Sequence, residues 1–216
     1  MVDPFLSMTP PLLLQTFEFE NRSIQLYVPD QFFVQQIFQQ KIKQHPLTPT
    51  PYWSQVWPAA ISLAQYLEKH THLIKNKKVL ELAAGLGLPS FTAAVYAKEI
   101  CCSDYLQEPL DVINQTIAYN QFNNITTSLL DWNNLPNEIM ADVLLLSDIN
   151  YELASFETLF TVLQRFIEQD TTVILSTPQR IIAKPFIQQL MPWCIEQEEM
   201  VHDNVLTMVM VLKNRF

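Results

Sequence analysis

Gly85 and Gly87 are the only glycines among the 216 residues of this chain, where average usage of about 7% would give about fifteen. They lie in the segment VLELAAGLGLPS, residues 79–90, which predicts a strand, a tight turn and a helix with Pro89 in its first turn. The exposed N–H groups of such a loop, together with the positive end of the helix, favour an anionic group. The two glycines therefore predict a ligand-binding loop, with plain turn chemistry as the alternative.

Polar side chains also follow the other apolar runs that we expect to be strands. Asp104 stands 23 residues beyond Glu81, after the second run, where a carboxylate can accept hydrogen bonds from both hydroxyls of a ribose. The third and fourth runs are followed by a further polar and aromatic group, Asp131, Trp132, Ser147, Asp148, Asn150 and Tyr151. Because ligands of open α/β sheets bind beyond the carboxyl ends of the strands, these residues predict one pocket for a nucleoside-type cofactor. Taken singly, each residue is equally compatible with a turn, a cap or packing.

The cysteines and histidines lack the spacing of a metal site. Cys101 and Cys102 are adjacent, Cys194 stands far from both, and the four histidines form no HExxH or paired cysteine–histidine pattern. An odd, small number of cysteines is also not a disulfide framework. We therefore expect no metal ion, and we interpret the cysteines as small buried apolar residues.

The apolar pattern that must position these side chains alternates between strands and helices. Strands are expected at residues 78–82, 100–103, 126–130, 141–147, 171–176, 194–200 and 205–212. Helices are expected from the glycine loop to about residue 98, and over residues 109–121, 154–169 and 178–190. This alternation is typical of an α/β fold with a doubly wound, Rossmann-like sheet of mostly parallel strands. No helix separates the last two strands, so they predict an antiparallel hairpin at one edge.

The residues before this core are predicted to form a cover. Two alternating runs around Asn21 predict a hairpin, and Asp30 can cap a helix that runs to about Gln44. A proline-rich connector follows, and Trp57-Pro58 opens a second helix that ends near His70. The chain is therefore expected to divide into a hairpin, helix and aromatic cover in residues 1–58 and a Rossmann-like core in residues 59–216.

Composition excludes several partners. Thirteen Lys and Arg against 22 Asp and Glu give a net charge of −9, whereas nucleic acid binding needs a basic surface. The apolar run at residues 12–14 follows two prolines and Asp3 without a basic segment, which predicts neither a signal peptide nor a membrane span. We expect a cytoplasmic protein with no nucleic acid or membrane partner.

The glycine loop narrows the choice of cofactor. A dinucleotide loop needs a third glycine or alanine where this chain has Ser90, so NAD is the second choice, and no Gly-Lys-Ser/Thr of a P-loop exists. ELAAGLGLPS resembles the first motif of class I, S-adenosylmethionine-dependent methyltransferases, which have a seven-stranded sheet. Three further segments are similar to the lysine methyltransferase-like branch of this class, with its Asp-x-x-Tyr motif. They are PYWSQVWP from residue 51, LDW from residue 130 and SDINYE from residue 147. The resemblance covers about residues 15–212.

This resemblance implies a binding site for S-adenosylmethionine. The residues that would hold the cofactor are Trp57, Glu81, Ala83, Gly85, Gly87, Asp104, Asp131, Trp132 and Ser147. Among them, Glu81, Ala83 and Gly85 would lie at the methionine end, Asp104 at the ribose, and Asp131 with Trp132 at the adenine. Trp57 would lie over the cofactor. Ala83 departs from the family, because the first loop glycine usually stands there.

The acceptor is expected to be an amine. Asp148 and Tyr151 would border it as the catalytic pair, accepting hydrogen bonds from an incoming ammonium, while nearby aromatic rings offer cation–π contact. The acidic balance also steers a cationic acceptor. A protein lysine is the first choice and a small-molecule amine the second. A catalytically silent cofactor-binding interaction module is a further alternative.

Overall fold

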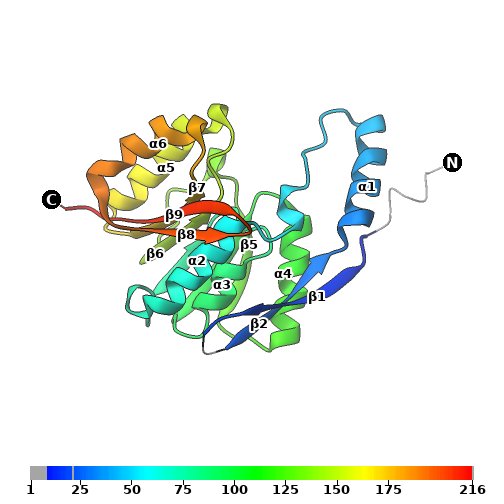
Figure 1. The fold of residues 1–216 in the computed structure, drawn as a ribbon, viewed down its shortest axis with the longest axis horizontal. Coiled ribbons are helices and arrows are strands. Elements are labelled where there is room, and N and C mark those ends of the chain that lie inside the picture. Colours follow the sequence, from blue (N-terminus) through cyan, green and yellow to red (C-terminus); the bar gives the residue numbers. More distant parts are fainter. Residues whose placement is uncertain (1–8, 21, 216) are drawn as a thin grey trace.

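The computed structural model describes residues 9–20 and 22–215 and is built around a seven-stranded sheet (Figure 1). The strand order is β5-β4-β3-β6-β7-β9-β8. The strands are β3 (Lys78–Glu81), β4 (Glu99–Asp104), β5 (Ile125–Leu129), β6 (Val143–Ser147), β7 (Thr172–Pro178), β8 (Cys194–His202) and β9 (Val205–Leu212). The first five pair in parallel, and β9 runs antiparallel to both β7 and β8. The expected doubly wound sheet with an antiparallel edge hairpin is confirmed.

Helices cover both faces of this sheet (Figure 1). One face packs against α2 (Pro58–Lys69), α3 (Leu88–Ala93) and α4 (Gln107–Asn120), and the other against α5 (Phe156–Glu168) and α6 (Lys184–Leu190). Neighbouring strand residues alternate between these two cores, so Val79 faces the first and Leu80 the second. None of the helices in residues 9–20 and 22–215 is long and apolar enough to cross a membrane.

Short 3₁₀ helices connect the larger elements. They are η2 (Tyr52–Ser54), η3 (Thr71–Leu73), η4 (Trp132–Asn134), η5 (Leu153–Ser155), η6 (Ile181–Ala183) and η7 (Met191–Trp193). Three of them, η2, η4 and η5, carry residues that line the pocket described below. In the β8–β9 hairpin, Asp203 and Asn204 both have positive φ, 48° and 61°, as a type I′ turn requires.

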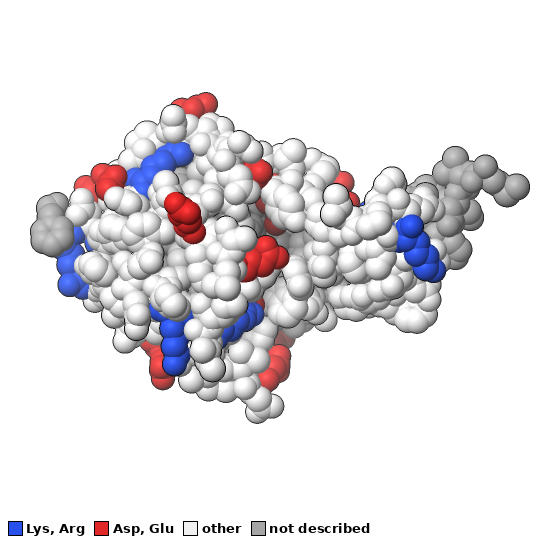
Figure 2. All heavy atoms as spheres, turned by 90° about the horizontal axis from the view of Figure 1, so that it is seen from above, with Lys and Arg blue, Asp and Glu red and all other residues white. Residues whose placement is uncertain are grey.

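The N-terminal segment forms a separate hairpin and a helix. Strands β1 (Leu12–Glu18) and β2 (Ser23–Pro29) pair antiparallel, and the apolar residues of β2 are buried against α3 and α4. Asn21, expected at the turn, lies outside the described residues. Asp30 caps α1 (Gln31–Gln44) as expected, because its carboxylate accepts hydrogen bonds from two backbone N–H groups. Helix α1 stands away from the sheet, on the side opposite the C-terminus (Figures 1 and 2).

The prediction that α3 runs to about residue 98 was wrong. The helix ends at Ala93 and the chain continues in turns. The side-chain amide of Asn124 donates to the carbonyl oxygens of Ala94 and Ala97, at 2.8 and 3.2 Å. These bonds come from a residue 27 to 30 positions away in the sequence, so a tertiary contact overrides the local helix propensity.

The prediction of a helix over residues 178–190 was also wrong at its start. Pro178 is the last residue of β7, and the ladder continues as the N–H of Gln179 donates to the carbonyl of Leu206 at 3.1 Å. Helix α6 begins only at Lys184, with a proline in its first turn. Residues 179–183 therefore form a connection beyond the carboxyl end of β7, where a parallel sheet places its ligand-facing loops.

Candidate functional site

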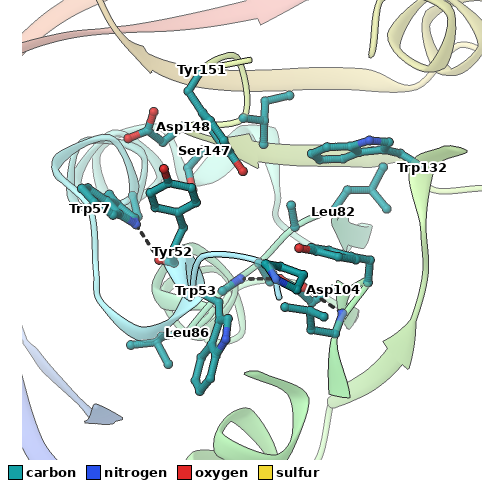
Figure 3. A pocket seen from close by; sticks show the side chains of 18 of the residues that line it. Tyr52, Trp53, Trp57, Leu82, Leu86, Asp104, Trp132, Ser147, Asp148 and Tyr151 are labelled. Atoms are coloured by element: carbon teal, nitrogen blue, oxygen red, sulfur yellow. Dashed lines mark hydrogen bonds between the residues drawn. The ribbon is translucent and has the colours of Figure 1, made fainter. Parts of the chain in front are cut away.

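The carboxyl ends of β3, β4 and β6 open into a cavity of about 550 Å³, a size that suits a small organic ligand (Figure 3). Of the site residues expected from the sequence, those that line this cavity are Trp57, Ala83, Gly85, Gly87, Asp104, Asp131, Trp132, Ser147, Asp148 and Tyr151. The segment before α2 covers it with Tyr52, Trp53 and Trp57. The strand ends and the cover therefore line the same cavity.

The loop after β3 has a backbone that favours glycine. Gly85 and Gly87 have φ of 54° and 73°, and Ala83 has φ of 52°, all in the left-handed region. A side chain on Gly85 would also meet the cover, because its Cβ would lie 3.5 Å from the carbonyl oxygen of Trp53. Ala83 takes the strained conformation with its methyl group in place, so the loop shape does not depend on a glycine at that position.

Asp104 connects the loops after β3 and β4. Its Oδ2 accepts the backbone N–H of Gly85 and its Oδ1 that of Leu106, each at 3.1 Å. Burial raises the pKa of this carboxyl group, and the backbone N–H groups oppose the increase. An ionised carboxylate has about four acceptor positions, so the two backbone bonds leave room for two hydroxyl donors from the cavity.

Two of the residues predicted to form the site do not line the cavity. One is Asn150, whose buried side chain accepts a hydrogen bond from the hydroxyl of Thr177 at 2.6 Å. The other is Glu81. Its side chain is completely buried behind the loop, where Oε2 accepts the N–H of Ser90 in α3 at 3.0 Å. Among the described residues Oε1 has no hydrogen-bond partner. Burial raises the pKa of Glu81 to about 8. In this arrangement Glu81 supports the start of α3 from beneath, which differs from the direct contact with the cofactor that the resemblance implied.

Three aromatic rings form one wall of the cavity (Figure 3). Tyr52 lies edge-on to Tyr151 at 5.3 Å between ring centroids and edge-on to Trp57 at 6.2 Å. The indole N–H of Trp57 donates to the carbonyl oxygen of Tyr52 at 2.8 Å, which fixes the cover. Burial, with Glu152 nearby, raises the pKa of Tyr151 to about 12. Its phenol therefore keeps its proton at neutral pH.

Asp148 follows β6 in a left-handed conformation with φ of 54°. Its N–H donates to the carbonyl oxygen of Ser176 on β7 at 2.9 Å, so the turn is fixed by the neighbouring strand. Its carboxylate forms an ion pair with Arg180, and its side chain is 8% exposed. The acid that we expected to contact an acceptor is therefore already paired within the protein.

The cavity lining is acidic. It includes the carboxylates of Asp104, Asp131, Asp148 and Glu152, and no lysine, arginine or histidine occurs among the described residues that line it. Asp131 caps η4 by accepting the N–H of Asn133 at 2.9 Å. Such a lining favours a ligand that carries positive charge.

Tyr105, Glu152 and Arg180 were not predicted as site residues from the sequence. Tyr105 and Glu152 line the cavity directly after residues that were identified, so their position after a strand end was a usable signal. Arg180 offered no such signal, because its segment was expected to be helical. Across residues 9–20 and 22–215, no group of three histidine, cysteine or acidic residues could hold a metal ion.

The strand order, the loop after β3 and the cavity above it define the class I methyltransferase fold. Residues 38–192 match the family model of lysine methyltransferases, and the chain belongs to this family.

Curated relatives include methyltransferases of proteins. The chain is 31% identical over 126 residues to histone-arginine methyltransferase METTL23 of Homo sapiens, a match covering 56% of this chain and 66% of that protein. It is also 31% identical over 129 residues to protein N-lysine methyltransferase METTL21A of Danio rerio, covering 56% and 58%. The chain thus spans half to two thirds of the length of such relatives.

Solved structures share the fold at low identity. The N-methyltransferase NodS of Bradyrhizobium japonicum, in complex with S-adenosyl-L-homocysteine, superposes with a TM-score of 0.62 at 12% identity. The match covers 82% of this chain and 98% of that one. This likeness supports the Rossmann-like architecture described above.

The left-handed backbone at Ala83 predicts a stabilising substitution. Ala83→Gly relieves the strain of a Cβ at positive φ and should raise the free energy of unfolding by about 0.5–1 kcal/mol. Ala84→Gly, one residue further at ordinary φ, is the matched control and should lower it by a similar amount. Urea denaturation measures both, and equal destabilisation by the two changes would contradict this account of the loop.

The raised pKa of Glu81 predicts a pH-dependent stability. The folded state holds the Glu81 proton up to a pH of about 8, whereas the unfolded chain releases it near pH 4.5. The contribution of Glu81 to the free energy of unfolding is therefore fully present below pH 4.5 and is lost as the pH rises through 8. Glu81→Gln removes this dependence and still accepts the N–H of Ser90. Denaturation at pH 5 should give similar stabilities, whereas at pH 8 the variant should be more stable by on the order of 3 kcal/mol. Parallel curves at both pH values would show that Glu81 is ionised in the folded protein.

Proposed function

We propose that this protein is an S-adenosylmethionine-dependent N-methyltransferase that acts on a lysine side chain of a protein substrate. The observation that carries the proposal is the acceptor end of the cavity, where Tyr52, Trp57 and Tyr151 stand beside Asp148. Aromatic faces and a carboxylate are the groups that bind an alkylammonium. The cytoplasmic location expected from the sequence is part of this proposal.

The other end of the cavity fits the cofactor. Asp104 has acceptor capacity left for the two ribose hydroxyls, and its hydrogen bond from the N–H of Gly85 holds the glycine loop at the edge of the cavity. Trp132 lies on the opposite side of the cavity from Trp57 in Figure 3 and suits a purine ring. Asp131, the residue before it, also lines the cavity and suits the exocyclic amine of the purine. The acidic lining also suits the positive sulfonium.

The cofactor, when bound, supplies an electrophilic methyl group: the S–CH₃ bond breaks as the amine lone pair forms the N–CH₃ bond, leaving a neutral thioether. The proton of the amine leaves to solvent. The chain aligns the amine and excludes water, because an in-line displacement gains most from orientation. Tyr151 keeps its own proton, so it orients the amine and does not remove the amine proton.

Support for a protein acceptor comes from the family and from relatives named as lysine or arginine methyltransferases. Tyr52 and Tyr151 are 46% and 39% exposed, so the acceptor end is open to a side chain that enters from outside. A small-molecule amine and a catalytically silent binding module are the alternatives. Both would leave protein lysines without label in the experiment below.

Removal of the negative charge of Asp148 should lower turnover and leave cofactor binding nearly unchanged. Asp148→Asn should lower catalytic efficiency by at least about tenfold, equivalent to about 1.4 kcal/mol, because it keeps the shape and loses the charge. Its affinity for S-adenosylhomocysteine should stay within about twofold. The measurement is transfer of tritiated methyl groups to proteins of a cell lysate, followed by acid hydrolysis to identify methylated lysine.

Glu152→Gln is the matched control for Asp148→Asn. Glu152 lines the same cavity but is exposed, so its loss should change efficiency by no more than about threefold. Equal activity of the wild type and the Asp148 variant would exclude Asp148 from the acceptor site. Label confined to small molecules would support the small-amine alternative, and no label at all the binding module.

Loss of the Asp104 carboxylate should weaken cofactor binding, which Asp148→Asn should leave nearly unchanged. Asp104→Ala removes the acceptors for the ribose and for the N–H of Gly85, so affinity for S-adenosylhomocysteine should fall by at least about tenfold. Asp104→Asn keeps one carbonyl oxygen and should lose less. Isothermal titration calorimetry measures both, and unchanged affinity in the alanine variant would remove Asp104 from the cofactor site.

A further inference from the structure

The ion pair between Asp148 and Arg180 sits at the acceptor end of the cavity. Asp148 lines the cavity, whereas Arg180 is not among its lining residues and approaches the carboxylate from the segment between β7 and η6. The Asp148 side chain is 8% exposed and that of Arg180 33%, so the carboxylate is the more deeply placed partner. In Figure 3 the carboxylate points away from Trp132.

The fold holds both partners in place. Strands β6 and β7 pair so that Ser147 lies opposite Ser176, and the N–H of Asp148 donates to the carbonyl oxygen of Ser176 at 2.9 Å. On the other strand, the N–H of Arg180 donates to the carbonyl oxygen of Pro178 at 2.8 Å. The pair is therefore built from two adjacent strand ends whose backbones are fixed by hydrogen bonds.

Arg180 is the positive charge at this carboxylate. The other titratable groups that line the cavity are all neutral or acidic: Tyr52 from the cover, Tyr151 and Glu152 from the segment after β6, Asp104 and Tyr105 at the end of β4, and Asp131 after β5. Near Arg180, the carboxylate of Glu199 on β8 accepts a hydrogen bond from Gln179. Without Arg180, the acceptor end would present uncompensated negative charge.

Uncompensated negative charge is a disadvantage for methyl transfer to an amine. A full carboxylate charge beside the acceptor favours its ammonium form, which has no lone pair and cannot attack a methyl group. A guanidinium on one carboxylate oxygen offsets part of that charge and leaves the second oxygen as a hydrogen-bond acceptor. Such a site can orient an amine without holding its proton.

We propose that Arg180 is a positioning residue that acts through Asp148 to keep the bound acceptor in its neutral, nucleophilic amine form. This inference rests on the proposed function for the identity of the acceptor. With Arg180 in place, the site binds an ammonium less tightly, and the bound acceptor is more reactive because its lone pair is free. Removal of Arg180 should therefore tighten ammonium binding and slow transfer at neutral pH.

Binding of n-butylammonium, a probe with the shape of a lysine side chain, tests the proposal without turnover. NMR titration at pH 7, with and without S-adenosylhomocysteine, compares the wild type with Arg180→Gln, Arg180→Lys and the double variant Arg180→Gln/Asp148→Asn. Arg180→Gln should bind the probe at least about fivefold more tightly. Arg180→Lys should match the wild type, and the double variant should lose the gain. Equal or weaker binding by Arg180→Gln overturns the proposal.

Arg180→His covers the case in which the glutamine variant does not fold. Its imidazolium can pair with Asp148 at pH 5.5 and loses its charge by pH 8. Affinity for n-butylammonium should rise over this interval in Arg180→His more than in the wild type. The same rise in both proteins overturns the proposal. Sodium chloride at matched ionic strength controls for screening.

Steady-state kinetics gives a second readout once an acceptor protein is labelled. Arg180→Gln should lower KM for the acceptor, lower kcat at pH 7, and move the rising limb of the kcat profile to higher pH, with rescue by Arg180→Lys. A merely structural role would lower kcat without moving the profile. If the wild type labels no lysine, the proposed function fails, and the n-butylammonium result still decides the role of Arg180.

Discussion

The left-handed backbone between residues 83 and 87 is the constraint on which the rest of the site depends. Three residues of this loop have positive φ, and the turn that they make presents the N–H of Gly85 to Asp104. The same turn brings Gly85 against the carbonyl of Trp53 and ends at Gly87, where α3 begins. One loop thus fixes the end of β4, the cover and α3 relative to one another.

Much of this arrangement could be predicted because it follows from local rules. Positive φ favours glycine, so the two glycines of this chain indicate the position of the loop, and the alternating apolar runs indicate the sheet. The failures have a common cause in contacts distant along the chain. Asn124 ends α3 from a different element, and the pairing of Pro178 with Thr207 extends β7 into a segment that has helical composition. Arg180 could not be assigned to the site for the same reason.

Three carboxylates at this edge of the sheet are buried, and the protein satisfies each in a different way. Glu81 is completely enclosed, and its raised pKa allows it to stay protonated. Asp104 accepts two backbone N–H groups and keeps acceptor capacity for a ligand. Asp148 has a guanidinium partner. These solutions match their positions, since only Asp104 and Asp148 reach the cavity and only there is an ionised oxygen useful for binding.

The cover contacts both ends of the cavity. Tyr52 and Trp53 are neighbours in η2, yet Tyr52 packs against Tyr151 at the proposed acceptor end while the backbone of Trp53 lies against Gly85 at the proposed cofactor end. The hydrogen bond from Trp57 to Tyr52 makes this segment one unit. A shift of the loop would therefore move the aromatic wall. Because the wall belongs to the cover and Asp148 to the core, the proposed acceptor end is complete only when the cover lies on the loop.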